Sequence, residues 1–81
     1  MKEIAKVIHW YDKIGVAVVR LSGSLKVGDE VVVHQGDKEH EDTISSMQVD
    51  LKDIPSGKKG DEVAIKLSQK AKEGSVISLK D

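Results

Sequence analysis

The fold of this chain is decided by the stretch Leu21–His34, which reads LSGSLKVGDEVVVH. β-Branched residues dominate Ile14–Leu21 before it, and a second valine-rich run, Val31–Val33, lies within it. Such runs favour strands, so the stretch is expected to connect two buried strands of a sheet. Gly23 and Gly28 bracket the connection, and we expect them to supply the positive φ that other residues adopt only at a steric cost.

Short segments of alternating apolar and polar residues recur along the rest of the chain. The strands that this pattern predicts are Met1–Tyr11, Ile14–Leu21, Glu30–His34, Thr43–Val49, Glu62–Leu67 and Ser75–Leu79. Six or seven short strands at regular spacing favour an all-β fold, a closed antiparallel barrel. Closure would also remove the exposed strand edges that a valine-rich chain leaves prone to aggregation.

The side chains of the second strand are expected to divide between two faces. Gly15, Ala17, Val19 and Leu21 would face the core, while Val16, Val18 and Arg20 would face outward. The two outward valines then need a cover, which a barrel end, a loop or another chain could provide. The apolar pair Val7-Ile8 predicts a bulge in the first strand.

Polar and glycine-rich segments connect the strands. Gln35–Asp42 is polar throughout and is expected to form a solvated hairpin loop, and Ser68–Gly74 to form at most one helical turn. Ile44 and Met47 are three residues apart, so a bulge near Ser45 is expected between them. We find no internal repeat. The residues expected to shape turns are Gly23, Gly28, Asp29, Gly60 and Asp61.

Composition indicates one small domain, residues 1–81. The 81 residues include no cysteine and no apolar stretch long enough for a membrane helix, so we expect a soluble, untargeted, cytoplasmic protein. The net charge of −1 is unevenly divided: residues 1–28 carry five lysines or arginines against two acids, residues 29–53 two against eight, and residues 54–81 six against four. Avid non-specific nucleic-acid binders are normally more basic.

Four segments of the chain together resemble a known family. They are Gly23–Asp29, Lys59–Leu67, His9–Val16 and Ser46–Gln48. Their order and spacing resemble the second, β-barrel domain of elongation factor Tu and related translation factors, and the small stand-alone proteins called translation elongation factor-like. This resemblance implies a translation-associated module that binds transfer or ribosomal RNA and uses no cofactor.

The sequence lacks the residue patterns that nucleotide binding, metal binding and catalysis require. Gly57-Lys58 lacks the first glycine and the hydroxyl of a phosphate-binding loop, so no nucleotide is expected. His34 and His40 lie close in sequence to the four acids of the segment Asp37–Asp42, and two histidines with a carboxylate could ligate zinc. The spacing fits no known motif, so we expect a hydrated loop without a metal. No nucleophile sits beside a recognisable base, so we expect no catalytic residue and no enzyme activity.

RNA binding requires cations for phosphates and aromatic faces for bases. The resemblance therefore makes the two aromatics and the lysines of the predicted turns the candidate RNA-binding residues: Trp10, Tyr11, Lys13, Lys58, Lys59, Lys70 and Lys72. The alternative role of Trp10 is to plug one end of a barrel that has no phenylalanine.

A second hypothesis is a protein-interaction module that docks on a partner enzyme. The outward Val16 and Val18 support it, and the acidic segment 37–42 would suit a basic partner. Barrels resembling this one occur as appended domains of collagenase-like peptidases, so such an enzyme is the partner this hypothesis names.

Overall fold

A computed structural model describes residues 3–80 of the chain. These residues form ten β-strands and no helix, so the expected all-β class is confirmed. The strands are β1 (Glu3–Tyr11), β2 (Val16–Leu21), β3 (Leu25–Lys26), β4 (Glu30–Gln35), β5 (Lys38–Thr43), β6 (Ser46–Val49), β7 (Lys52–Asp53), β8 (Ser56–Gly57), β9 (Glu62–Lys66) and β10 (Val76–Leu79).

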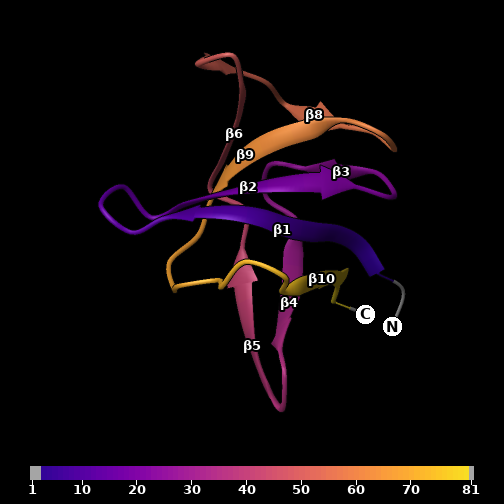
Figure 1. Cartoon of the computed structure of the whole chain (residues 1–81). Coiled ribbons are helices and arrows are strands. Elements are labelled where there is room, and N and C mark those ends of the chain that lie inside the picture. Colours follow the sequence, from indigo (N-terminus) through magenta and orange to yellow (C-terminus); the bar gives the residue numbers. More distant parts are fainter. Residues whose placement is uncertain (1–2, 81) are drawn as a thin grey trace.

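Eight of these strands form one antiparallel sheet, in the order β5-β4-β10-β1-β2-β9-β6-β7, and β3 pairs with β8 in a small second sheet (Figure 1). The expected closed barrel is wrong, because this sheet is open. β6 pairs with β9 on one edge and with β7 on the other, so it has no free edge with which to close the sheet.

Ile44 and Ser45 connect the terminal strand β5 to β6, the strand next to the other end of the sheet. The Gly28 amide donates to the Ile44 carbonyl at 2.8 Å, and the Ile44 amide donates to the Asp29 carbonyl at 3.0 Å. These bonds satisfy the backbone outside the strands. The segment predicted as one strand with a bulge, Thr43–Val49, is therefore the end of β5, a bent connection and β6.

Strands β1 and β2 follow their sequence patterns. In β2, Ala17, Val19 and Leu21 are buried, whereas Val16 and Val18 are half-buried and Arg20 is exposed, as expected. The expected bulge in β1 is confirmed, since the register with β2 shifts between Val7 and His9.

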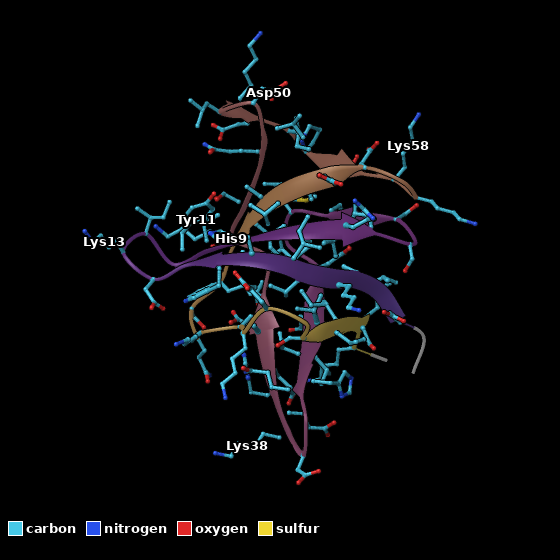
Figure 2. The ribbon with its side chains drawn as sticks, in the orientation of Figure 1. His9, Tyr11, Lys13, Lys38, Asp50 and Lys58 are labelled. Atoms are coloured by element: carbon cyan, nitrogen blue, oxygen red, sulfur yellow. The ribbon has the colours of Figure 1, made fainter. Side chains whose placement is uncertain are left out.

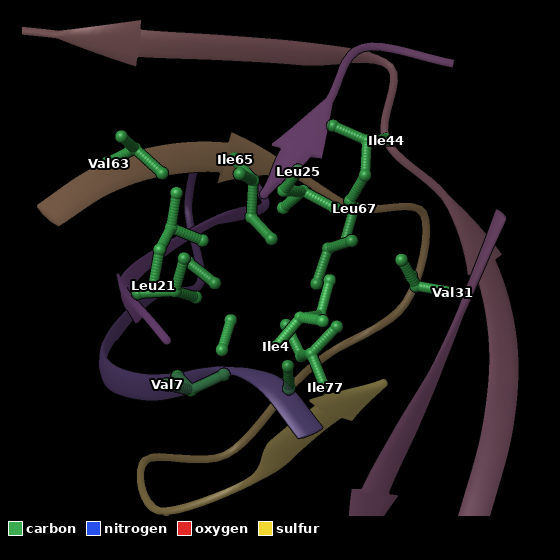
Figure 3. Packing of buried hydrophobic residues seen from close by; sticks show 14 of the residues in the cluster. Ile4, Val7, Leu21, Leu25, Val31, Ile44, Val63, Ile65, Leu67 and Ile77 are labelled. Atoms are coloured by element: carbon green, nitrogen blue, oxygen red, sulfur yellow. The ribbon is translucent and has the colours of Figure 1, made fainter. Parts of the chain in front are cut away.

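The core lies between the curved halves of the sheet (Figure 3). It is aliphatic and contains the side chains of Ile4, Val7, Leu21, Leu25, Val31, Ile44, Val63, Ile65, Leu67 and Ile77, together with Met47 and smaller residues. Ile44 and Met47 are both buried although they are three residues apart, because the bend before β6 resets the alternation.

One of the two polar connections differs from expectation. The polar segment predicted as a loop, Gln35–Asp42, forms the β4–β5 hairpin, and β5 pairs with β4 from Glu30↔Thr43 to Gln35↔Lys38. Charged side chains suit β5 because it is an edge strand with solvent on its open side. The segment Ser68–Gly74, expected to form at most one helical turn, is irregular and contains no helix, and the Gln35 side chain is bonded to its backbone.

The two turns that lead into β4 and β9 are an internal repeat, contrary to our expectation of none. They read SLKVGDEV (residues 24–31) and SGKKGDEV (residues 56–63). Gly28 and Gly60 have φ of 94° and 93°, and each following aspartate accepts a hydrogen bond from the backbone of the lysine three residues before it. The repeats meet where β3 pairs with β8, with Leu25 opposite Gly57.

Gly23 does not have the positive φ that we expected of it. Its role is spatial, because a Cβ at this position would lie 3.3 Å from Cγ2 of Ile4. The glycine thus allows the chain that leaves β2 to pass close to β1, where the amides of Ser22 and Gly23 donate to the Ile4 carbonyl.

Candidate docking surface

The outward side of strands β1, β2, β9, β6 and β7 forms a continuous surface. Residues that pair across antiparallel strands point to the same face. One row runs His9, Val18, Ala64, Gln48 and Asp53, and the next runs Tyr11, Val16, Lys66 and Ser46. We call these nine residues the outer sheet face. Figure 2 shows His9 and Tyr11 beside one another on this side of the β1–β2 ribbon.

The centre of the outer sheet face is apolar. Val16, Val18 and Ala64 are half-buried, whereas their inward neighbours Ala17 and Val19 are fully buried. Tyr11, opposite Val16 in the register, is 47% exposed and widens the apolar area toward the β1–β2 turn. An apolar centre with polar surroundings is the usual anatomy of a protein–protein interface.

Contacts between polar side chains border this surface. Nδ1 of His9 lies 2.9 Å from Oε2 of Glu73, and the His9 ring contacts Tyr11 edge-on with 4.3 Å between ring centroids. At the other end, Nε of Arg20 donates to Oε2 of Glu62 at 3.1 Å. All four side chains are about half-exposed, so these contacts contribute little to the stability of the fold.

The two candidate aromatics point in different directions. Trp10 is half-buried and packs against the core, and its indole N–H donates to the Asp12 carboxylate. Tyr11 lies on the outer sheet face. Trp10 is therefore only partly exposed, which reduces the area of its indole ring that a base could stack on.

The five candidate lysines do not gather on one surface. Figure 2 places Lys13 at the β1–β2 turn and Lys58 at the opposite end of the sheet. Lys58 lies with Lys26 in an open groove of about 660 Å³ between the two repeated turns, and Lys59 follows it in the same turn. Nζ of Lys70 is 3.9 Å from Asp12.

Acidic side chains lie beside two of these lysines. Lys70 and Lys72 line a second groove, of about 590 Å³, together with Asp37 and Glu39 of the β4–β5 hairpin. Such mixed charge does not attract a phosphate backbone as a basic stripe would.

The β4–β5 hairpin brings His34 beside an acidic side chain. Nδ1 of His34 lies 3.0 Å from Oε2 of Glu39, but residues 3–80 contain no cluster of three or more side chains suited to holding a metal ion. In that same part of the chain, no helix is long and apolar enough to cross a membrane.

One highly exposed apolar residue was not predicted from the sequence. Leu51 stands at the tip of the β6–β7 hairpin and is 91% exposed. A two-residue hairpin turn is normally signalled by Asn-Gly or Asp-Gly. Here the turn is Asp50-Leu51, so the pattern contained no glycine to mark it.

Comparison with known proteins points to peptidases. No family model matches the chain. An uncharacterized protease of Methanocaldococcus jannaschii is 35% identical over 78 residues, which are 95% of this chain and 19% of the relative. The chain thus spans about a fifth of the curated relative it matches.

Two solved structures have the same fold. One is the C-terminal domain of a Geobacillus thermoleovorans protein named as a U32 peptidase, with a TM-score of 0.91 and 13% identity over 99% of this chain and 93% of that one. The selenomethionine variant of that domain gives 0.87 and 15% over 95% and 98%.

The expected membership of the elongation factor-like family is therefore wrong, and the translation role and RNA binding that it implied lose their support. The resemblance rested on glycine-based turns. Such turns specify backbone geometry, which proteins of unrelated function can share. The chain has the fold of the C-terminal domain of a U32 peptidase and a sequence relative among proteases.

Proposed function

We propose that this chain is a non-catalytic protein-binding module that docks on a U32-type peptidase through the outer sheet face. The observation that carries the proposal is the match of almost the whole chain to a small part of a protease, together with a fold likeness to the C-terminal domain of a U32 peptidase. A segment that takes up 19% of its relative has the size of an accessory domain.

The outer sheet face has the composition that such docking needs. Val16, Val18 and Ala64 supply apolar area, Tyr11 supplies an aromatic anchor, and the Arg20–Glu62 pair lies at the rim. A standard interface covers roughly 800 Å² on each partner. The described chain exposes 5183 Å², so a docked partner would cover about a sixth of its surface.

The proposal is tested by calorimetric titration of the chain with a full-length U32-type peptidase from the organism that makes it. We expect saturable binding with a Kd of about 1–100 µM, typical of a modest interface. Val18→Glu places a charge at the apolar centre, so we expect binding at least about tenfold weaker, which corresponds to about 1.4 kcal/mol.

The matched control is Val27→Glu. Val27 is a valine too, 41% exposed, but it lies in the turn after β3, outside the outer sheet face. We expect this variant to bind as the unmodified chain does. Absence of binding at about 100 µM would contradict the docking function, and equal losses in both variants would contradict the assignment of the surface.

A further inference from the structure

The β6–β7 hairpin continues the outer sheet face away from the body of the sheet. Gln48 pairs with Asp53 and Val49 with Lys52, and Nε2 of Gln48 donates to Oδ1 of Asp53 at 2.9 Å. The Ile54 amide donates to the Met47 carbonyl, also at 2.9 Å. The hairpin is thus held by backbone and side-chain bonds, and it projects from β6 at the top of Figure 1.

The turn of this hairpin is strained. Asp50 and Leu51 have φ of 52° and 67°, and they are the non-glycine residues with positive φ in the described chain. Positive φ at both central residues matches the twist of a hairpin but favours glycine or asparagine. Leucine adopts this conformation at a steric cost, because its Cβ approaches the backbone carbonyl.

Within residues 3–80, Leu51 has no burial that would offset this strain. Its side chain is 91% exposed, whereas the other exposed large apolar residues range from 36% to 58%. Figure 2 shows the neighbouring Asp50 at the tip of the hairpin, far from the core. A leucine that keeps this backbone strain while almost fully exposed suggests a contact with another molecule.

We propose that Leu51 is a hydrophobic anchor that inserts into an apolar pocket on the peptidase. This inference rests on the proposed docking function and adds the residue that fixes its geometry. The partner is the same because Gln48 and Asp53, at the base of the hairpin, belong to the outer sheet face. A partner bound to that face would also contact the β6–β7 hairpin, which projects beyond it.

Two substitutions at Leu51 separate anchoring from folding. Asparagine tolerates positive φ and removes the apolar side chain, so Leu51→Asn is expected to leave the melting temperature unchanged or to raise it by a few degrees. The same variant is expected to bind the full-length peptidase about 10- to 100-fold more weakly. Leu51→Met keeps an apolar side chain and is expected to bind within about threefold of the unmodified chain.

The outcomes are distinct. If the unmodified chain binds and Leu51→Asn binds equally well, the anchor is refuted while the docking function stands. A melting temperature more than about 5 °C lower in Leu51→Asn would show that the leucine supports the fold, which also refutes the anchor. If the unmodified chain does not bind the peptidase, both proposals are overturned together.

Discussion

Asp42 clamps the edge strand β5 to the segment that follows β9, and its removal should be the most damaging polar substitution in the chain. Only 9% of this residue is exposed. Its carboxylate accepts hydrogen bonds from the amides of Thr43 at 2.8 Å, Ser68 at 3.0 Å and Gln69 at 3.2 Å, and from the Ser68 hydroxyl at 3.0 Å.

The cost of Asp42→Ala follows from these contacts. Three backbone amides lose a charged acceptor, and each such bond contributes about 1.5–3 kcal/mol. Ser68 and Gln69 are exposed, so water recovers part of the loss, and we expect about 3–5 kcal/mol in total. A chain of this size has a free energy of unfolding of about 4–12 kcal/mol, so the melting temperature should fall by at least about 12 °C.

Thermal and urea denaturation followed by circular dichroism measure this effect. Asp42→Asn keeps one acceptor oxygen but turns an NH₂ group toward the donors, so its loss should be intermediate. Glu41→Ala is the matched control, because Glu41 is the neighbouring acid but is exposed and forms a surface ion pair with Lys80. An Asp42→Ala variant within about 1 kcal/mol of the unmodified chain, or a control that loses as much, would refute the clamp.

Two glycine substitutions should act by different physics, and both are measured by urea denaturation. Gly28→Val forces a β-branched residue to a φ of 94° with nothing within 4 Å of the new Cβ, so strain alone should cost about 1–3 kcal/mol; an unchanged stability would contradict the assigned turn. Gly57→Val has no such φ, but its Cβ would lie 2.6 Å from Cδ1 of Leu21, so overpacking should cost about 1–3 kcal/mol. Gly57→Val should become less costly when combined with Leu21→Ala, whereas no such coupling is expected for Gly28→Val.

Alternation in the sequence was enough to predict the strands whose two faces differ. β2 shows this best, since Val19 faces the core and Val18 faces outward. β5 could not be predicted in this way, because its residues are polar and it is held by backbone pairing with β4 and by Asp42. Closure of the sheet into a barrel was predicted from the number of strands. The sheet stays open because β7 pairs with the edge of β6 that closure would need.

The candidate surface was predictable only in part. Val16 and Val18 were expected to need a cover, and the structure places them at the centre of the outer sheet face. Leu51 gave no signal, since a lone leucine between polar residues fits neither a strand nor a usual turn. The candidate lysines were chosen because they lie in predicted turns, and the topology separates them. Lys13 lies before the start of β2 and Lys58 before the start of β9, and these two strands are antiparallel neighbours, so their starts lie at opposite ends.

Methyl NMR of the labelled chain, titrated with unlabelled full-length U32-type peptidase, tests the central claim most directly. The account predicts that the methyl signals of Val16, Val18 and Leu51 shift or broaden first. Those of Val27, in the turn after β3, and of Leu79, which lines the groove between the repeated turns, should stay in place. Perturbation confined to Val27 and Leu79, or no perturbation at saturating peptidase, would contradict docking through the outer sheet face.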